Sequence, residues 1–277
     1  MRGHGEAKRH KRGPGRAGPR QARRGGGLRR PVVIVLAVAL VAALLASGLL
    51  LRSLAPGGAP AEPSTPQAAI VDQLGLRAPN PEFVKDTTDM LEQAGYSVDY
   101  YPAEEVTVDL YRDLPSRGYE FIILRVHSGR VRGTGGSEIA LFTSELYTPT
   151  KYVEEQRSLR LAIATSYKGG PQYFAIERGF IESSMRGRFD DTTVILMGCN
   201  GLRNDRSATA FLQKGAKSFV SWDRFVSASH TDAATERLLE HHLVNGLSME
   251  DAVAQTMAEV GPGPSFGAEL RIVSGGR

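Results

Sequence analysis

Two side chains capable of nucleophilic chemistry follow patterns of buried strands. His127 comes directly after the run FIILRV at 121–126, and Cys199 comes directly after TVILMG at 193–198. Near-continuous apolar runs of this length are typical of strands buried on both faces of a sheet. Ligands of open α/β sheets bind outside the carboxyl ends of the strands. If these two strands are neighbours, His127 and Cys199 converge on one cleft.

A thiol beside an imidazole is suited to acyl transfer. A free cysteine has a pKa of about 8.5 and is only a few per cent thiolate at neutral pH. An imidazole can accept the thiol proton or, once protonated, lower the pKa of the thiol. Glycines beside both residues let a substrate backbone approach and expose N–H groups for an oxyanion. Taken singly, a cysteine at the end of a strand is often only buried, and such a histidine only hydrogen-bonded.

The elements that must position this pair are strands alternating with helices. The patterns predict strands at 69–74, 97–101, 121–126, 193–198, 217–222 and 269–273. They predict helices at 81–94, 108–114, 172–188, 208–213, 229–244 and 248–260, and strands of an excursion at 139–142 and 159–164. This alternation predicts an α/β fold, with a mostly parallel sheet and helices on both faces. The excursion at 130–190 is expected to form part of the cleft or to cover it.

The arrangement resembles the caspase-like (clan CD) cysteine peptidases, which include caspases, gingipains, clostripain, separase and CHAT domains. The shared features are a strand ending in histidine with a nearby glycine and a later strand ending in a small residue and cysteine. The order downstream of the cysteine looks like the CHAT and gingipain pattern: Phe211–Leu212, Lys214–Val220, Ser221–Asp223, Thr231–Ala234, Leu238–Leu239, Leu243, Gly246–Ser248 and Asp251–Val253. The resemblance covers roughly 121–259.

This resemblance implies a role for each residue that matches the pattern. It implies His127 as general base or acid and Cys199 as nucleophile, with backbone amides near Gly129 and Cys199 forming the oxyanion hole. The family's glycine usually follows the histidine directly, whereas here Ser128 stands between His127 and Gly129. Some relatives use calcium, but no clear carboxylate loop supports it here, and we expect no cofactor.

Two further residues are weaker candidates for substrate binding. Asp223, just after the strand at 217–222, could line a pocket for a basic side chain, because a carboxylate pairs with Arg or Lys. It could equally cap a turn or the next helix. Trp222 could be a platform for substrate, or it could pack in the core.

Other histidine and glycine clusters do not predict a metal or phosphate site. His241 and His242 are adjacent on a predicted helix and therefore point in different directions. With His230 they match no zinc-ligand spacing. The run at 133–136 (GTGG) lacks the Gly-Lys-Ser/Thr ending of a phosphate-binding loop.

The charge of the chain is divided unevenly. Residues 1–30 contain eleven Lys or Arg and the single acid Glu6, a net charge of +10. The whole chain carries +4, which leaves −6 for residues 31–277. The basic tail at 1–30, rich in Gly, Pro and Arg, is expected to be disordered. Because the remainder is mildly acidic, we expect no nucleic-acid binding by the folded domain.

Residues 31–51 predict one transmembrane helix. They read PVVIVLAVALVAALLASGLLL, without a charged residue, and a helix of that length spans about 30 Å, the thickness of a bilayer's hydrocarbon core. The basic block before them places the N-terminus in the cytoplasm and residues 52–277 outside the cytoplasm. A cleaved signal peptide is the alternative, although its apolar core is usually only about 7–15 residues long.

The rest of the chain is predicted to be one folded domain on a linker. Residues 52–67 are rich in Pro, Gly and Ala and form the linker, and the domain covers 68–277. Cys199 is the sole cysteine, so a disulfide within the chain is impossible. The sequence therefore predicts a peptidase anchored in the cell membrane, acting on a peptide or protein substrate. The alternative is an inactive caspase-like module for recognition or scaffolding at the cell surface.

Overall fold

The computed structural model describes residues 65–131 and 138–276. The predicted basic tail at 1–30, the predicted transmembrane helix at 31–51 and nearly all of the linker lie outside these residues. Within the described ranges, no helix combines the length and the apolar character needed to cross a bilayer. The first strand of the described residues begins at Gln67.

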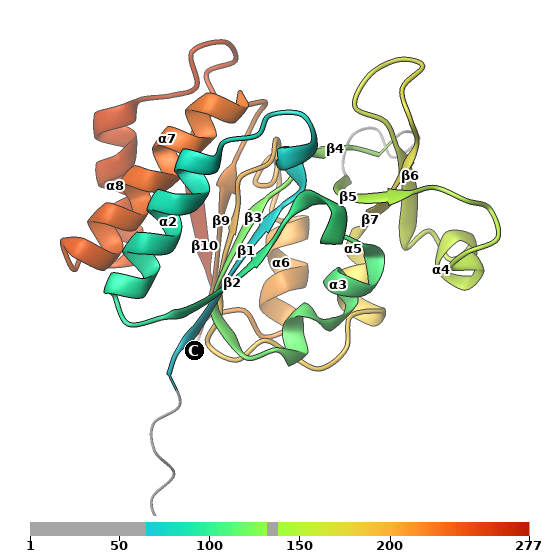
Figure 1. Cartoon of the computed structure of the whole chain (residues 1–277), viewed down its shortest axis with the longest axis horizontal. Coiled ribbons are helices and arrows are strands. Elements are labelled where there is room, and N and C mark those ends of the chain that lie inside the picture. Colours follow the sequence, from blue (N-terminus) through green and yellow to red (C-terminus); the bar gives the residue numbers. More distant parts are fainter. Residues whose placement is uncertain (1–64, 132–137, 277) are drawn as a thin grey trace, which may run out of the picture. The chain divides into compact units, whose positions relative to one another are not determined.

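Six strands form the central sheet (Figure 1). Their order across the sheet is β10 (Leu270–Ser274), β9 (Ser218–Trp222), β8 (Thr193–Leu196), β3 (Tyr119–Arg125), β1 (Gln67–Asp72) and β2 (Ser97–Tyr101). All neighbouring pairs are parallel except β9 and β10, which are antiparallel. Every residue of β8 and β9 is buried, as the apolar runs predicted for strands covered on both faces.

Helices cover both faces of this sheet. One face packs against α2 (Pro81–Gln93), α7 (Ala228–Leu239) and α8 (Met249–Val260). The other packs against α3 (Val108–Asp113), α5 (Arg178–Ser183) and α6 (Arg206–Gln213). Along β3, Phe121 and Ile123 point into the first core, and Ile122 and Leu124 into the second. The predicted α/β fold with a mostly parallel sheet and helices on both faces is confirmed.

Short helical turns complete the connections of the domain. Three are 3-10 turns: η1 (Gln73–Leu76), η2 (Ala103–Glu105) and η3 (Leu114–Ser116). A π-helical turn, η4 (Glu240–Val244), continues α7, so the helix predicted at 229–244 is present as two consecutive segments. Asn80 caps α2 and Ser248 caps α8, because their side chains accept the N–H groups three residues further on.

The excursion between β3 and β8 forms a second sheet. Its strands are antiparallel, in the order β4 (Ser128–Arg130), β5 (Ile139–Leu146), β7 (Tyr173–Ile176) and β6 (Leu161–Ala164). The single helix predicted at 172–188 is wrong, because its first part is β7 and only Arg178–Ser183 is helical. Phe174 belongs to the strand: pairing with β5 and β6 on both sides satisfies its backbone and overrides the helical spacing of the apolar residues.

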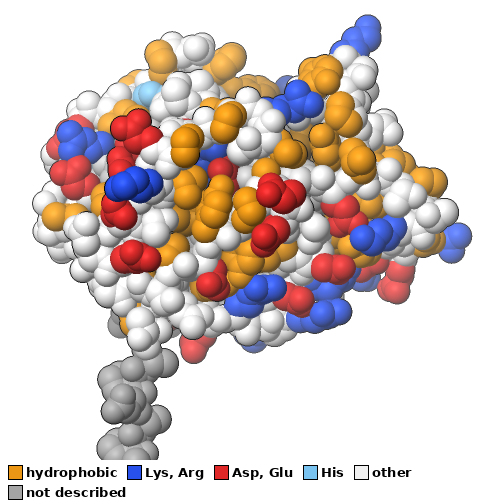
Figure 2. Space-filling view, in the orientation of Figure 1, with side chains coloured by type: hydrophobic (Ala, Val, Ile, Leu, Met, Phe, Trp, Pro, Cys, Tyr) orange, Lys and Arg blue, Asp and Glu red, His pale blue; other side chains and the backbone are white. Residues whose placement is uncertain are grey.

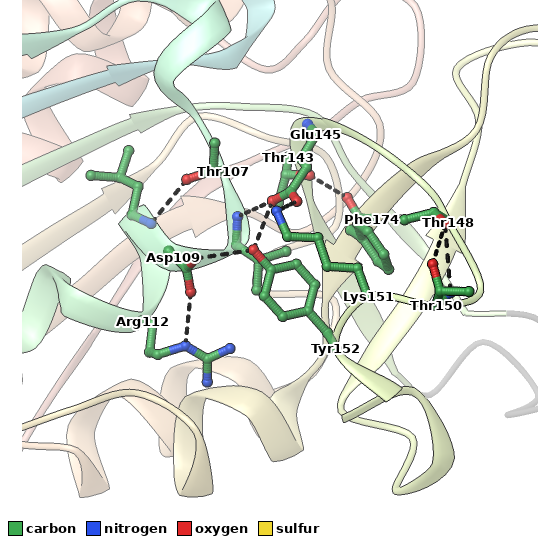
Figure 3. A network of polar contacts seen from close by, with 12 residues as sticks. Thr107, Asp109, Arg112, Thr143, Glu145, Thr148, Thr150, Lys151, Tyr152 and Phe174 are labelled. Atoms are coloured by element: carbon green, nitrogen blue, oxygen red, sulfur yellow. Dashed lines mark hydrogen bonds and ion pairs between the residues drawn. The ribbon is translucent and has the colours of Figure 1, made fainter. Parts of the chain in front are cut away.

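A polar network holds the second sheet and the short α4 (Val153–Arg157) region to α3 (Figure 3). Glu145, near the end of β5, accepts the N–H of Val108 at 3.1 Å, at the amino end of α3. The Tyr152 hydroxyl donates to Asp109 at 3.1 Å and to Glu145 at 3.2 Å, and Lys151 pairs with Glu145. The carboxylate at the start of α3 also suits the positive end of the helix dipole.

The surface charge of the domain is mixed. Figure 2 shows acidic and basic side chains interspersed over the face in view, without a broad basic area there. Apolar side chains gather in the same view over the region of the second sheet. Leu146 of β5, Ile163 of β6 and Leu159, just before β6, are exposed.

Candidate functional site

His127 and Cys199 emerge from neighbouring strands. The strands β3 and β8 pair in parallel with Leu124 opposite Leu196, and the Met197 N–H donates to the Leu124 carbonyl oxygen at 3.0 Å. Both chains therefore leave the sheet side by side at its carboxyl edge. The condition for the two side chains to share a cleft is met.

A small hollow of about 40 Å³ has both residues in its wall. The residues that line it, most of them apolar, are Leu74, Val126, His127, Met197, Gly198, Cys199, Val226, Ala228 and Thr231. A larger cavity of about 680 Å³ is at the opposite edge, beside the first residues of β8 and β9. Neither His127 nor Cys199 lines this larger cavity.

The thiol of Cys199 lies against the backbone of Val226. The Sγ atom donates to the Val226 carbonyl oxygen at 3.5 Å, and the Val226 N–H donates to Sγ at 3.5 Å. Burial raises the pKa of Cys199, and the backbone of Val226 only partly opposes that rise. In this arrangement the side chain is a neutral thiol at pH 7.

The backbone of His127 is fixed on two sides. Its N–H donates to the Gln73 side-chain oxygen at 2.9 Å, and its carbonyl accepts the Phe142 N–H at 2.9 Å. Its imidazole lies 5.7 Å from the Phe142 ring centre and makes no hydrogen bond with any other described residue. Burial, and secondarily the positive charge of Arg77, lower the pKa of His127. The ring is therefore neutral at pH 7, and a neutral ring retains a nitrogen lone pair that can accept a proton.

Ser128 ties the two site loops together. Its hydroxyl donates to the Cys199 carbonyl oxygen at 2.5 Å. It fills the space beside Gly198, where an added Cβ would clash with the Ser128 hydroxyl and lie only 2.6 Å from the Val126 carbonyl oxygen. Gly129, the second residue of β4, lies opposite Ala140 of β5. The serine between His127 and Gly129 thus has a structural role of its own.

Asn200 was not identified from the sequence. Its backbone is left-handed, with φ of 61°, and its N–H donates to the Arg224 carbonyl oxygen at 2.9 Å. Its side chain is buried, yet neither its oxygen nor its nitrogen has a hydrogen-bond partner. The Asn200–Gly201 pair was a usable signal, since Asn-Gly favours positive φ in tight turns. This turn is what directs the chain sharply away after Cys199.

Neither of the two weaker candidates lies in the wall of the hollow. Trp222 is fully buried, and its indole N–H donates to the Thr231 hydroxyl at 2.8 Å, so its ring has no free face for a substrate. The Asp223 carboxylate accepts the Glu269 N–H at 2.9 Å and pairs with Arg271 at 3.0 Å. Asp223 therefore joins the ends of β9 and β10, and its charge is already compensated.

A buried ion cluster beneath the site was also not identified. Arg125 at the end of β3 is fully buried and donates twice to Asp232 of α7, at 2.8 Å each, and once to Asp72 of β1, at 2.7 Å. Burial lowers the pKa of Arg125, but its bonds to Asp232 and Asp72 outweigh that effect and raise it. The signal was the single charge within FIILRV. The cluster joins three elements at the carboxyl edge.

In the part of the chain that the structure describes, no group of three or more His, Cys, Asp or Glu side chains is arranged to hold a metal ion. Comparison of the chain with models of known protein families gives no match, and comparison with curated proteins gives none either.

Proposed function

We propose that this protein is a caspase-like cysteine peptidase that uses Cys199 as nucleophile and His127 as general base. The observation that carries the proposal is their position: they follow adjacent parallel strands at the carboxyl edge and line the same hollow. The α/β architecture and the strand-end histidine and cysteine motifs support the same assignment. The proposed anchor at 31–51 then makes it a membrane protein with an extracytoplasmic domain.

The proposed reaction starts from the neutral pair. The thiol turns from the Val226 carbonyl toward His127, which takes its proton as Sγ attacks the carbonyl carbon of the peptide bond. The imidazolium then protonates the leaving amine, the C–N bond breaks, and an acyl thioester remains on Cys199. Water, deprotonated by His127, hydrolyses the thioester and restores the thiol. Backbone N–H groups at Gly129 and Cys199 are proposed to hold the oxyanion.

The test is labelling of Cys199 by a thiol-reactive peptide probe in the purified full-length chain. Three proteins are compared: wild type, His127→Ala, and the control His242→Ala, whose imidazole bonds to the Leu247 carbonyl oxygen at 2.8 Å. A general base contributes about 10²–10⁴-fold. We expect labelling to fall by that order in His127→Ala and to be unchanged in His242→Ala. Equal labelling of all three proteins contradicts the proposal.

A second candidate function is a recognition module without catalysis. It is favoured by the raised pKa of Cys199 and the lowered pKa of His127, because together they disfavour a thiolate–imidazolium pair. This candidate predicts that Cys199 reacts only after the protein is unfolded in urea. It also predicts that Cys199→Ala leaves the binding of partners intact.

A further inference from the structure

Two exposed aromatic rings lie beside the wall that holds Cys199. Phe225 is 40% exposed and Phe266 is 57% exposed, and their ring centres are 5.6 Å apart. Phe225 immediately precedes Val226, whose backbone contacts the Cys199 sulfur. The pair therefore adjoins the candidate site, although the two rings come from loops 41 positions apart in the chain.

Backbone hydrogen bonds hold these two loops in place. In the loop between α8 and β10, Gly267 donates to the Gly263 carbonyl oxygen at 2.8 Å, and Gly263 donates to that of Ala268 at 2.8 Å. The Arg224 side chain reaches across from the loop after β9 and donates to the Gly267 carbonyl oxygen at 3.1 Å. Exposed aromatic rings on fixed backbones can bind a partner at little entropic cost. Such rings are typical anchors of recognition sites.

A positive charge without a carboxylate partner completes the patch. The guanidinium of Arg130, in β4, lies 6.0 Å from the Phe225 ring centre. It makes no ion pair with a carboxylate of the described residues, whereas Arg271 of β10 is paired with Asp223 and Glu269. On the His127 side, Arg77 likewise lies over a ring, 4.5 Å from the centre of Tyr167. A guanidinium stacked on a ring keeps its donors free for a carboxylate.

We propose that Phe225, Phe266 and Arg130 form a subsite for an extended peptide segment in which a large apolar side chain is followed by Asp or Glu. The apolar side chain packs on the two rings, and the carboxylate pairs with Arg130. The inference rests on the proposed function, because the segment continues from this subsite toward Cys199. It replaces the earlier expectation of a basic side chain held by Asp223, whose carboxylate is already paired.

The experiment measures binding separately from cleavage. The full-length chain carrying Cys199→Ala is titrated into fluorescein-labelled Gly/Ser peptides that contain Phe-Glu, Phe-Gln, Phe-Lys or Ala-Glu, and anisotropy gives Kd. We expect the Phe-Glu peptide to bind most tightly, and Phe225→Ala or Phe266→Ala to weaken it about ten-fold or more. We expect Arg130→Gln to abolish the preference of Glu over Gln. The controls are Leu159→Ala, at an exposed apolar residue, and Arg157→Gln, at an exposed arginine.

Three results would overturn the proposed subsite. They are equal affinity for the Phe-Glu and Phe-Lys peptides, an unchanged Kd in both Phe variants, and no binding at millimolar peptide. Binding is measured in the Cys199→Ala chain, so it does not depend on cleavage. If this chain binds the Phe-Glu peptide selectively but the wild type cleaves no peptide, the proposed peptidase activity is contradicted and the proposed subsite is supported. If the wild type cleaves peptides without this selectivity, the peptidase activity is supported and the subsite is contradicted.

Discussion

Replacing Asp232 by Asn should be among the most damaging single changes of a polar residue in this domain. The Asp232 carboxylate accepts two hydrogen bonds from Arg125 and one from Asn80, at 2.8–2.9 Å, and side chains on both sides of the ion pair are almost fully buried. An Asn side chain has nearly the same shape, but it offers one acceptor oxygen in place of two. Its NH₂ group would face a donor of Arg125, and the pair would lose its charge complementarity.

The expected cost follows from this burial. Removing one partner of a buried ion pair costs about 3–5 kcal/mol, because the remaining charge is left partly uncompensated. Asp72→Asn should cost less, since Asp72 accepts only one bond from Arg125, at 2.7 Å; its other two bonds, from the Gly75 N–H at 3.0 Å and the Tyr100 hydroxyl at 3.3 Å, come from uncharged donors. The control is Glu182→Gln in the exposed Arg178–Glu182 pair, where about 0.2–1 kcal/mol is expected.

Trp222 provides the assay. It is the sole tryptophan, it is fully buried, and its indole bonds to Thr231, the residue before Asp232. Urea unfolding followed by its fluorescence gives the free energy of unfolding, and an unchanged slope shows that the same surface unfolds in each variant. A loss below about 1 kcal/mol for Asp232→Asn, equal to that of the surface control, would refute the reasoning. It would mean that the cluster is hydrated and holds the carboxyl edge no more tightly than a surface pair does.

Three further changes test other parts of the structure by the same measurement. Gly198→Ala should destabilise by about 1–3 kcal/mol, because the added Cβ overpacks the buried turn, whereas Gly276→Ala, in open space, should cost nothing measurable. The lowered pKa of His127 means that, as pH falls below about 6.5, the unfolded chain binds a proton before the folded one does. The free energy of unfolding should therefore decrease as pH is lowered through that window. His127→Gln should make this decrease smaller. Tyr152→Phe should cost about 0.5–1.5 kcal/mol through lost hydrogen bonds and should leave Cys199 labelling unchanged.

The strands of the central sheet were predictable because burial on both faces leaves a continuous apolar run. The run at 121–126 overlaps β3, and the run at 193–198 contains β8. The antiparallel direction of β10 was not predicted, but the element order explains it. Two helices, α7 and α8, separate β9 from β10, so the chain returns to the carboxyl edge before the last strand begins. One connecting helix would have given a parallel strand.

The sequence predicted where the candidate site lies but not the protonation states of its side chains. Strand ends located His127 and Cys199, but their protonation depends on groups far away in the sequence. Val226 contacts the thiol from the loop after β9, and Arg77 acts on the imidazole from the loop after η1. The segment at 172–188 failed for a related reason, since a strand that pairs on both sides is decided by its partners rather than by its own spacing.

The edge at which the chain enters the domain bears on what the site can reach. The Pro66 carbonyl accepts the Ser97 N–H at the start of β1 and β2, so the chain joins the sheet at its amino edge (Figure 1). His127 and Cys199 lie at the carboxyl edge, and a strand of six residues separates the two edges by about 20 Å. A tether preceding β1 would therefore attach opposite the hollow and the Phe225–Phe266 pair. A peptide can therefore reach the hollow without passing the residues at which the chain enters the sheet.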